Sequence, residues 1–228
     1  IYEKQKKFLS AEGNVKIKDF NGNILTSEKA TFDQINNIIS TFGNSKLSTT
    51  EGYKLSTKNI IYNTASKLLS SASESIIQDI DGNEVQTTSF QYNLIDNIFS
   101  SVGNIKVIDI KKNKYFFKEF YNDKKNKKMV GSDVDVVLDQ ESFGVNNESD
   151  PRFVANDIFL SKEESILSKA VFTTCKRRGE KCPPWILKAK KINHDKAKKT
   201  IFYEDAILKI YDIPIFYFPK FFHPDPTV

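Results

Sequence analysis

The stretch FSSVGNIKV, residues 99–107, decides the fold expected for this chain. Its side chains alternate, so that Phe99, Ser101, Ile105 and Val107 share one face of an extended strand. Gly103 stands in the middle of the run, where a glycine is typical of a bend or of a close backbone approach. The pattern predicts a β-strand that folds over at its centre.

This pattern recurs with a period of 30 residues, which is the signature of a repeat architecture. AEGNV (11–15) and TFGNS (41–45) repeat the central glycine, and in SASES (71–75) Ser73 stands where the third repeat would have it. Two further registers keep the same period: one holds Gly22, Gly52 and Gly82, and the other holds Phe32, Tyr62 and Tyr92, each followed by Asp or Asn. Because turn residues separate runs rich in Ile, Val, Thr, Phe and Tyr, the chain is predicted to form antiparallel strands joined by hairpin turns.

The predicted fold is all-β: an elongated, open β-jelly roll of about 14–16 bent antiparallel strands. Bends at a common height would stack the strands into a V-shaped trough that each added unit lengthens. Its inward face alternates large residues with Gly, Ser and Thr, so it either packs on itself or leaves room for a ligand. The residues expected to line a ligand-holding face are Val15, Ile17, Ile39, Leu47, Leu69, Ile77, Phe99, Ile105 and Val107.

Composition and motifs argue against an enzyme. The formal charge is +5, and the lysines gather in turn-like runs such as KKNK (111–114) and KKNKK (124–128), which are typical of solvated loop tips; an anionic partner is the alternative. Exposed aromatics are not interleaved with these lysines as nucleic-acid binding would require. No HExxH, GxSxG, P-loop or GxGxxG occurs, and the two histidines are far apart in the sequence. We expect no catalytic residue, no metal, no cofactor and no nucleic-acid partner.

Cys175 and Cys182 are the only cysteines, and they flank the loop KRRGEK. The spacing is unlike that of a CxxC metal site. Two cysteines across so short a hairpin-like loop favour a disulfide and therefore an oxidising compartment such as a periplasm. Two free thiols, or thiols bonded elsewhere, are the alternatives.

The last 45 or so residues carry a resemblance. The segment holds Trp185, His194-Asp195, Tyr203-Glu204-Asp205-Ala206 and, after an apolar Pro-containing run, His223-Pro224-Asp225-Pro226. In this order it resembles the segment that joins the periplasmic domain to the barrel in the LptD family of outer-membrane lipopolysaccharide-assembly proteins. The repeats over 9–138 are similar to the OstA-type jelly roll of several transport proteins.

The resemblance implies a function in lipopolysaccharide transport and outer-membrane assembly, on the periplasmic face of the outer membrane. It implies lipopolysaccharide as the ligand, with its acyl chains in the trough, and a periplasmic bridge protein of the LptA type as a partner. The first strand, Gly13, Asn14, Val15, Lys16 and Ile17, would offer an open edge to that partner. An LptE-like lipoprotein would bind mainly through the barrel, and in better-known members the cysteines of this domain pair with barrel cysteines.

The domain organisation that follows is a single periplasmic domain over 1–228. Residues 1–139 form the repeat region, 140–174 are less regular, and 175–228 lead toward an outer-membrane β-barrel. Two other functions stay open: a soluble bridge protein of the same export system, and a structural β-solenoid with a self-packed core.

Overall fold

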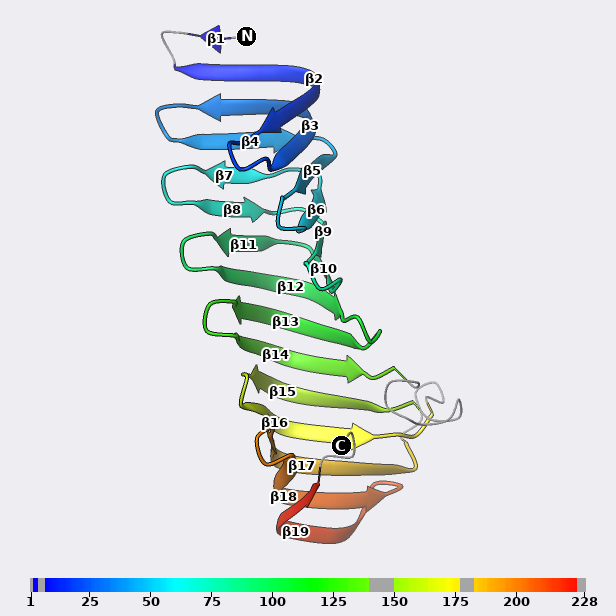
Figure 1. Ribbon diagram of the computed structural model, residues 1–228. Helices are drawn as coiled ribbons and strands as arrows, with labels where there is room; N and C mark the ends of the chain where they lie inside the picture. The colour runs from blue at the N-terminus through cyan, green and yellow to red at the C-terminus, as the bar shows by residue number, and fades with distance from the viewer. Residues whose placement is uncertain (1, 4–6, 140–149, 177–182, 225–228) are drawn as a thin grey trace. The chain divides into compact units, whose positions relative to one another are not determined.

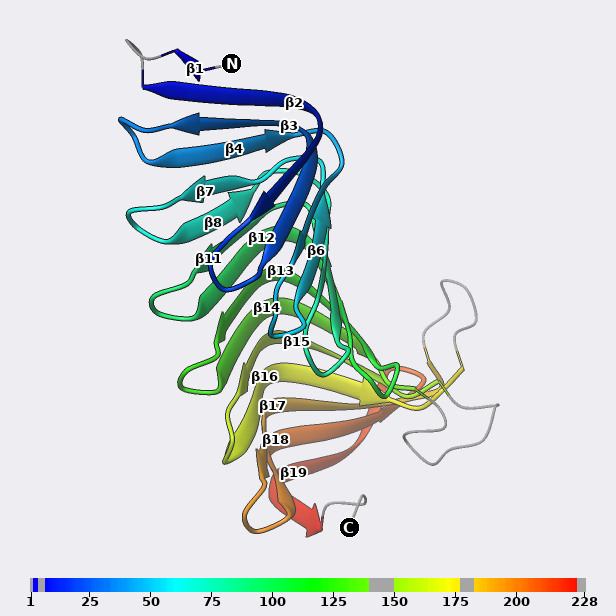
Figure 2. The ribbon, with the colours of Figure 1, turned by 45° about the horizontal axis from the view of Figure 1, so that its top comes forward.

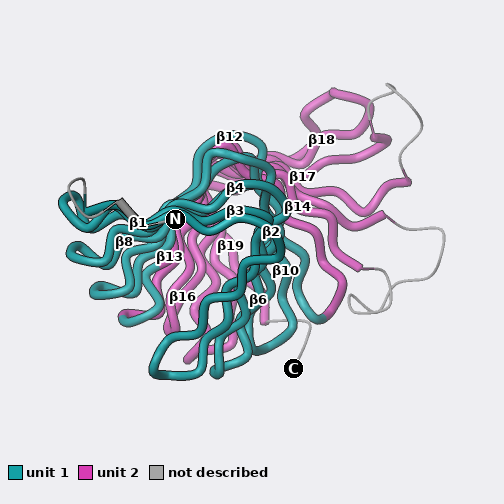
Figure 3. Tube along the Cα trace, turned by 90° about the horizontal axis from the view of Figure 1, so that it is seen from above, with its two compact units in different colours: residues 1–110, 123–125 teal, residues 111–122, 126–228 magenta. Residues whose placement is uncertain are grey.

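The computed structural model describes residues 2–3, 7–139, 150–176 and 183–224. These residues form strands and turns, with no helix long and apolar enough to cross a membrane among them. The chain divides into two compact units (Figure 3): unit 1 comprises residues 1–110 and 123–125, and unit 2 comprises 111–122 and 126–228. The all-β class expected from the sequence is confirmed.

Unit 1 is built from twelve short or bent strands over its described residues (Figure 1). They are β1 (Tyr2–Glu3), β2 (Phe8–Lys18), β3 (Ile24–Asp33), β4 (Ile38–Phe42), β5 (Ser45–Ser48), β6 (Lys54–Thr57), β7 (Ile61–Asn63), β8 (Leu68–Ser71), β9 (Ser75–Gln78), β10 (Glu84–Thr87), β11 (Phe90–Asn93) and β12 (Ile98–Ile108).

The strands of unit 1 form two arms that meet at a corner (Figure 2). In arm 1, the first half of β2, the second half of β3 and the first half of β12 pair in one ladder with β4, β7, β8 and β11. In arm 2, the remaining halves of β2, β3 and β12 pair with β5, β6, β9 and β10. The chain therefore crosses the corner once in every strand, as the mid-strand glycines predict.

Backbone conformation at the corner explains the glycine register. Gly43 and Gly103 have φ angles of 71° and 114°, which L side chains rarely adopt, and Asn44 follows Gly43 at 33°. A Cβ on Gly43 would collide with the side chain of Glu28, and one on Gly103 would lie 2.8 Å from Thr88 Oγ1. In the repeat that has Ser73 in place of the glycine, the chain still bends between the end of β8 and the start of β9.

The aromatic-Asp/Asn register forms the hairpin turns at the tip of arm 1. Asp33 Oδ1 accepts the backbone N–H groups of Ile35 and Asn36 at 2.9 and 3.1 Å. Asn63 and Asn93 accept the equivalent pairs in their own turns. A short side chain that bonds the backbone two and three residues on is the reason that Asp or Asn stands at this position.

Unit 2 contains nearly all of β13 (Lys114–Asp123), followed by β14 (Lys128–Val137), β15 (Arg152–Leu160), β16 (Glu164–Thr173), β17 (Trp185–Asp195), β18 (Thr200–Ile210) and β19 (Ile213–Pro224). Successive strands from β14 to β19 pair antiparallel. β15 and β16 lie in the region expected to be less regular.

The strands of unit 2 bend without glycine. Asp133, Lys169 and Asp205 take positive φ angles of 48–49° within β14, β16 and β18. Small side chains fill the space beside these bends: Ala155, Ala170, Ala189 and Ala206 are all buried. Across the described residues, four bent strands of unit 1 are split in two at the corner, so the nineteen labelled strands correspond to fifteen continuous ones, within the expected range.

Candidate ligand-binding face

The inner face of unit 1 carries one continuous apolar row on each arm. Register pairing links the row of arm 1 from strand to strand: Leu9, Phe32, Ile39, Tyr62, Leu69, Tyr92 and Phe99. The row of arm 2 runs in the same way: Ile17, Leu25, Leu47, Leu55, Ile77, Val85 and Val107. We call these rows 1 and 2.

Between the two rows, small hydroxyl side chains line the corner. This hydroxyl ladder consists of Ser27, Thr41, Ser45, Thr57, Ser71, Ser75, Thr87 and Ser101, all of them buried. Neighbouring members bond to each other, with Oγ–Oγ distances of 2.6 Å for Thr41–Ser45 and for Thr87–Ser101.

The ladder also satisfies backbone groups that the bends leave without a strand partner. Thr41 Oγ1 accepts the N–H of Ile60 at 2.8 Å, and Ser27 Oγ donates to the carbonyl of Phe42 at 2.8 Å. Ser101 Oγ donates to the carbonyl of Ser89 at 2.7 Å. Because an unpaired buried backbone group is costly, hydroxyl residues stabilise a corner that larger apolar side chains would not fit.

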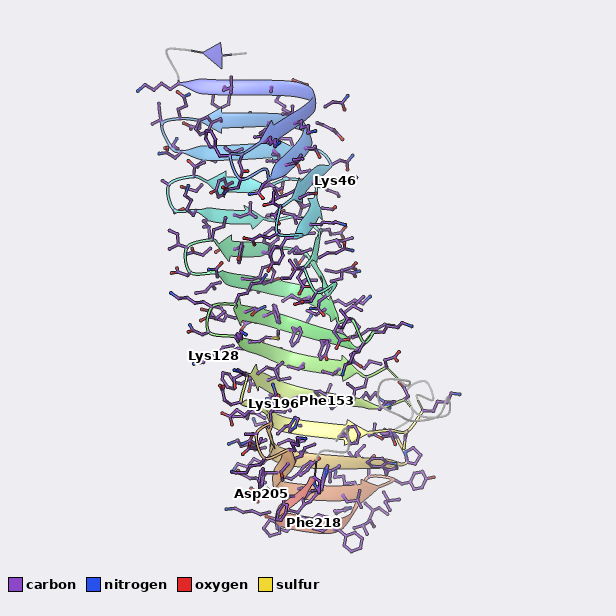
Figure 4. All side chains as sticks on the ribbon, viewed as in Figure 1. Lys46, Lys128, Phe153, Lys196, Asp205 and Phe218 are labelled. Atoms are coloured by element: carbon purple, nitrogen blue, oxygen red, sulfur yellow. The ribbon has the colours of Figure 1, made fainter. Side chains whose placement is uncertain are left out.

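Rows 1 and 2 are only partly shielded from solvent. Of their fourteen side chains, Leu55 and Phe99 are buried, Leu9 is 44% exposed, and the others are half-buried. The outer face of arm 2 differs in chemistry, because the row next to row 2 reads Lys16, Thr26, Lys46, Ser56, Ile76, Gln86 and Lys106. Lys46 (Figure 4) is exposed on this outer face.

The structure brings all nine predicted lining residues to the inner face. Seven belong to rows 1 and 2; Val15 lies opposite Ser27, and Ile105, which is 2% exposed, lies beside the corner. The prediction omitted seven row members: Leu9 on β2, and Leu25, Phe32, Leu55, Tyr62, Val85 and Tyr92 on the strands between those named. The signal that finds them is the same two-residue offset from the corner residue of each strand.

The predicted partner edge lies on β2. Gly13 and Asn14 have positive φ angles of 82° and 49° and interrupt the register with β3, so these two residues form the bend rather than an edge ladder. Val15, Lys16 and Ile17 continue as a strand paired with β3. Among the described residues β1 pairs only with Phe8 and Leu9, at the other end of β2.

The turns at the tip of arm 2 stack on each other next to this edge. Methyl groups of Thr50, Ile80 and Ile110 lie over the glycine of the preceding turn, 3.0–3.6 Å from where a Cβ would stand. The N–H of Thr50 also donates to the Asn23 side chain at 3.0 Å. Phe20 has the equivalent place in the first turn, and its side chain is fully exposed.

In unit 2, the motif residues of the C-terminal segment contact each other. The rings of Tyr203 and Phe221 stack with centroids 4.3 Å apart, and the Tyr203 hydroxyl lies 3.0 Å from His223 Nε2. Burial raises the pKa of Tyr203. Tyr217 donates to Asp205 at 2.7 Å, and this hydrogen bond raises the pKa of Tyr217. The motif therefore fixes β18 against β19, whose own apolar residues remain largely exposed, including Phe218 (Figure 4).

The cysteine prediction lies partly outside the described residues. Cys175 is half-buried, with its sulfur 3.9 Å from the carbonyl oxygen of Trp185. Cys182 falls in the segment 177–182, which the structure does not describe, so the pairing stays a prediction. No cluster of three metal-ligating side chains is found in the described part of the chain.

Comparison with known proteins gives the family. The family model described as "OstA-like protein" matches residues 2–148, more than half of the chain. The chain belongs to the OstA-like family. Among curated relatives, "LPS-assembly protein LptD" of Acidovorax sp. (strain JS42) is 31% identical over 68 residues, which is 29% of this chain and 8% of that protein. The chain thus spans only a small part of that relative's length.

Among solved structures, the OstA-like chain is similar to LptH of Pseudomonas aeruginosa, described as the LptA homologous periplasmic component of the lipopolysaccharide transport device. The TM-score is 0.41 at 14% identity, covering 45% of this chain and 76% of that one.

Proposed function

We propose that this protein binds the acyl chains of lipopolysaccharide along rows 1 and 2 and shields them during transport to the outer membrane. The observation that carries the proposal is the incomplete burial of the two rows. Eleven of their fourteen side chains are half-buried and one is exposed, although they form unbroken apolar stripes on facing arms.

A self-packed solenoid would bury these stripes. The hydroxyl ladder also argues against a self-packed solenoid. Its side chains hydrogen-bond to one another at the corner, so rows 1 and 2 do not join an apolar core there. Contiguous apolar surface of this kind marks a binding site in a stable protein.

The magnitude of acyl-chain burial suits a carrier. Burial of each methylene contributes about 0.8 kcal/mol, so ten methylenes contribute on the order of 8 kcal/mol before ordering costs. A lipid held in this way does not leave into water unaided, yet no covalent step is needed to move it along the face. The proposed role is therefore non-covalent transport rather than catalysis.

The lipid identity is supported by the relatives. Membership of the OstA-like family and the 31% identity to a lipopolysaccharide-assembly protein favour lipopolysaccharide over other amphiphiles. The motif of β18 and β19 favours the assembly protein over a soluble bridge protein of the same system. We therefore infer a position on the periplasmic face of the outer membrane, with any LptE-like contact made mainly outside this domain.

A bridge protein of the LptA type is the proposed donor of the lipid, and its docking site is the arm 2 end of β2. Val15 to Lys18 offer a strand edge beyond which no described strand lies, and the exposed Phe20 stands beside it. A further strand from the partner would extend the ladder, and its last turn would cover Phe20 as Thr50 covers Gly22.

Photo-crosslinking with benzoylphenylalanine tests the proposal. The probe at Leu47, Ile77 or Val107 should capture lipopolysaccharide, whereas the same probe at Lys46, Ile76 or Lys106 should not. Ile76 and Ile77 are the sharpest pair, because the residue type is the same and only the face differs. Equal labelling of both sets would reject the inner face as the lipid site.

A further inference from the structure

Two residues that break the pattern of the 30-residue repeat, Tyr53 and Lys124, contact each other. Tyr53 stands where the arm 2 turns of other repeats have Asn23 and Asn83. Lys124, in the turn between β13 and β14, stands where the arm 1 turns have Gln34, Thr64 and Leu94. The equivalence is structural as well, because Gln34, Thr64, Leu94 and Lys124 each donate a backbone N–H to the preceding turn.

The Lys124 ammonium lies over the Tyr53 ring, with Nζ 3.9 Å from the ring centroid. It is also 5.8 Å from the centroid of Tyr92, which belongs to row 1. Both distances fall in the range of cation–π attraction. Burial raises the pKa of Tyr92, and the neighbouring Tyr53 and Glu51 add to this effect, so charges and rings from the two arms are close together here.

Each partner is held by its own arm. Lys124 donates its N–H to the carbonyl of Asn97 at 3.1 Å, and the Tyr92 hydroxyl donates to the Asn97 side chain at 3.1 Å, which fixes both to arm 1. Tyr53 exchanges hydrogen bonds with Thr49 in the arm 2 turn at 2.9 and 3.0 Å. The contact therefore spans from the tip of one arm to the tip of the other.

We propose that Tyr53, Tyr92 and Lys124 form a clasp across the mouth of the inner face, and that the clasp is a recognition site for the anionic headgroup of a bound amphiphile. This rests on the proposed function, since the acyl chains must lie between rows 1 and 2 for the headgroup to reach the mouth. A charge-assisted hydrogen bond from the ammonium to a phosphate is stronger than its attraction to a part-exposed ring. A phosphate-bearing amphiphile therefore takes Lys124 from Tyr53 and opens the clasp, whereas a neutral one leaves it closed.

The distance between the arms is the readout. Spin labels at Ser66 of arm 1 and Lys54 of arm 2, both exposed, are placed in a Cys175→Ser, Cys182→Ser background of the full chain. Double electron–electron resonance then reports the spacing without ligand. Lys124→Gln and Tyr53→Asn should each raise the open-to-closed ratio about twofold to fivefold. Tyr53→Phe, which keeps the ring, and Lys125→Gln, which removes the adjacent exposed charge, should leave it unchanged.

Two amphiphiles with the same tail test the headgroup step: dodecyl phosphate and dodecyl maltoside, both below their critical micelle concentrations. Dodecyl phosphate should widen the distance in the parent chain and have no added effect in Lys124→Gln, and dodecyl maltoside should widen neither. An equal response to both amphiphiles, or the same response in Lys124→Gln as in the parent, would overturn headgroup recognition. If Lys124→Gln changes the distance between the arms without ligand, but calorimetry shows that neither amphiphile binds, the proposed function fails while the clasp stands. If Lys124→Gln does not change that distance, the clasp itself is refuted.

Discussion

The hydroxyl ladder gives a quantitative prediction at Thr41. The side chain is 1% exposed, and its Oγ1 both accepts the N–H of Ile60 at 2.8 Å and bonds to Ser45 Oγ at 2.6 Å. Thr41→Val keeps the shape and the β-branched character and removes the oxygen. The N–H of Ile60 then has no acceptor in a buried place, at a cost of about 1–3 kcal/mol. Ser45 keeps its contact with Ser27 at 3.2 Å, so its loss adds little, and we expect a total destabilisation of about 2 kcal/mol.

Hydrogen exchange measures this effect locally, which matters because the chain has two compact units and need not unfold in one step. The amide of Ile60 should exchange about 30-fold faster in Thr41→Val, since 1.4 kcal/mol corresponds to a factor of ten. Thr31→Val is the matched control: Thr31 lies in the neighbouring strand with its side chain on the outer face, and substitutions there should change stability by less than about 0.5 kcal/mol. Unchanged protection of Ile60, or equal effects of the two substitutions, would refute the role assigned to the ladder.

Three further predictions concern the edge, a turn and the cysteines. Phe20→Ser should weaken docking of an LptA-like bridge protein by about 1–2 kcal/mol in calorimetry, whereas Ile80→Ser, in a turn farther from the edge, should not; equal effects would remove Phe20 from the contact. Hydrogen bonds from the turn that it caps hold the pKa of Asp33 below its usual value, so the turn's contribution to stability is complete above the unfolded pKa and declines as the pH falls through the lower folded pKa. Carboxyl NMR titration should therefore give a midpoint below 3.8, and a midpoint at or above it would contradict the capping role. Thiol counting under denaturing, non-reducing conditions on chain exported to an oxidising compartment should find no free thiol if the two cysteines pair with each other; two free thiols would reject that bond.

The sequence predicts where the strands of unit 1 bend and which alternate side chains of each strand lie on the inner face. Gly43 and Gly103 mark bends because L side chains rarely adopt their φ angles and an added Cβ would crowd Glu28 or Thr88, and two-residue alternation from those points assigns Leu47 and Val107 to the inner face. The bends of unit 2 are not marked by glycine in the sequence. Lys169 and Asp205 adopt positive φ without glycine, since the surrounding ladder determines their conformation more strongly than local preference does.

The hydroxyl ladder and the clasp are beyond sequence reasoning for different reasons. Serine and threonine occur on both faces of these strands, so composition alone does not separate buried Thr41 from Thr31. Tyr53 and Lys124 each stand out as breaks in the repeat, but nothing in a one-dimensional pattern says that the tips of two arms approach each other. Their contact requires the three-dimensional course of both arms.

Two adjacent positions on β8 show whether acyl chains lie on the inner face of unit 1. Leu69 belongs to row 1, and Ser70 faces the opposite side of the same strand. A nitroxide at either position in the background without native cysteines is examined by electron paramagnetic resonance with and without lipopolysaccharide. We expect lipopolysaccharide to immobilise the label at Leu69 and to shield it from a water-soluble relaxation agent, with no change at Ser70. An unaffected label at Leu69, or equal changes at the two positions, would contradict this expectation.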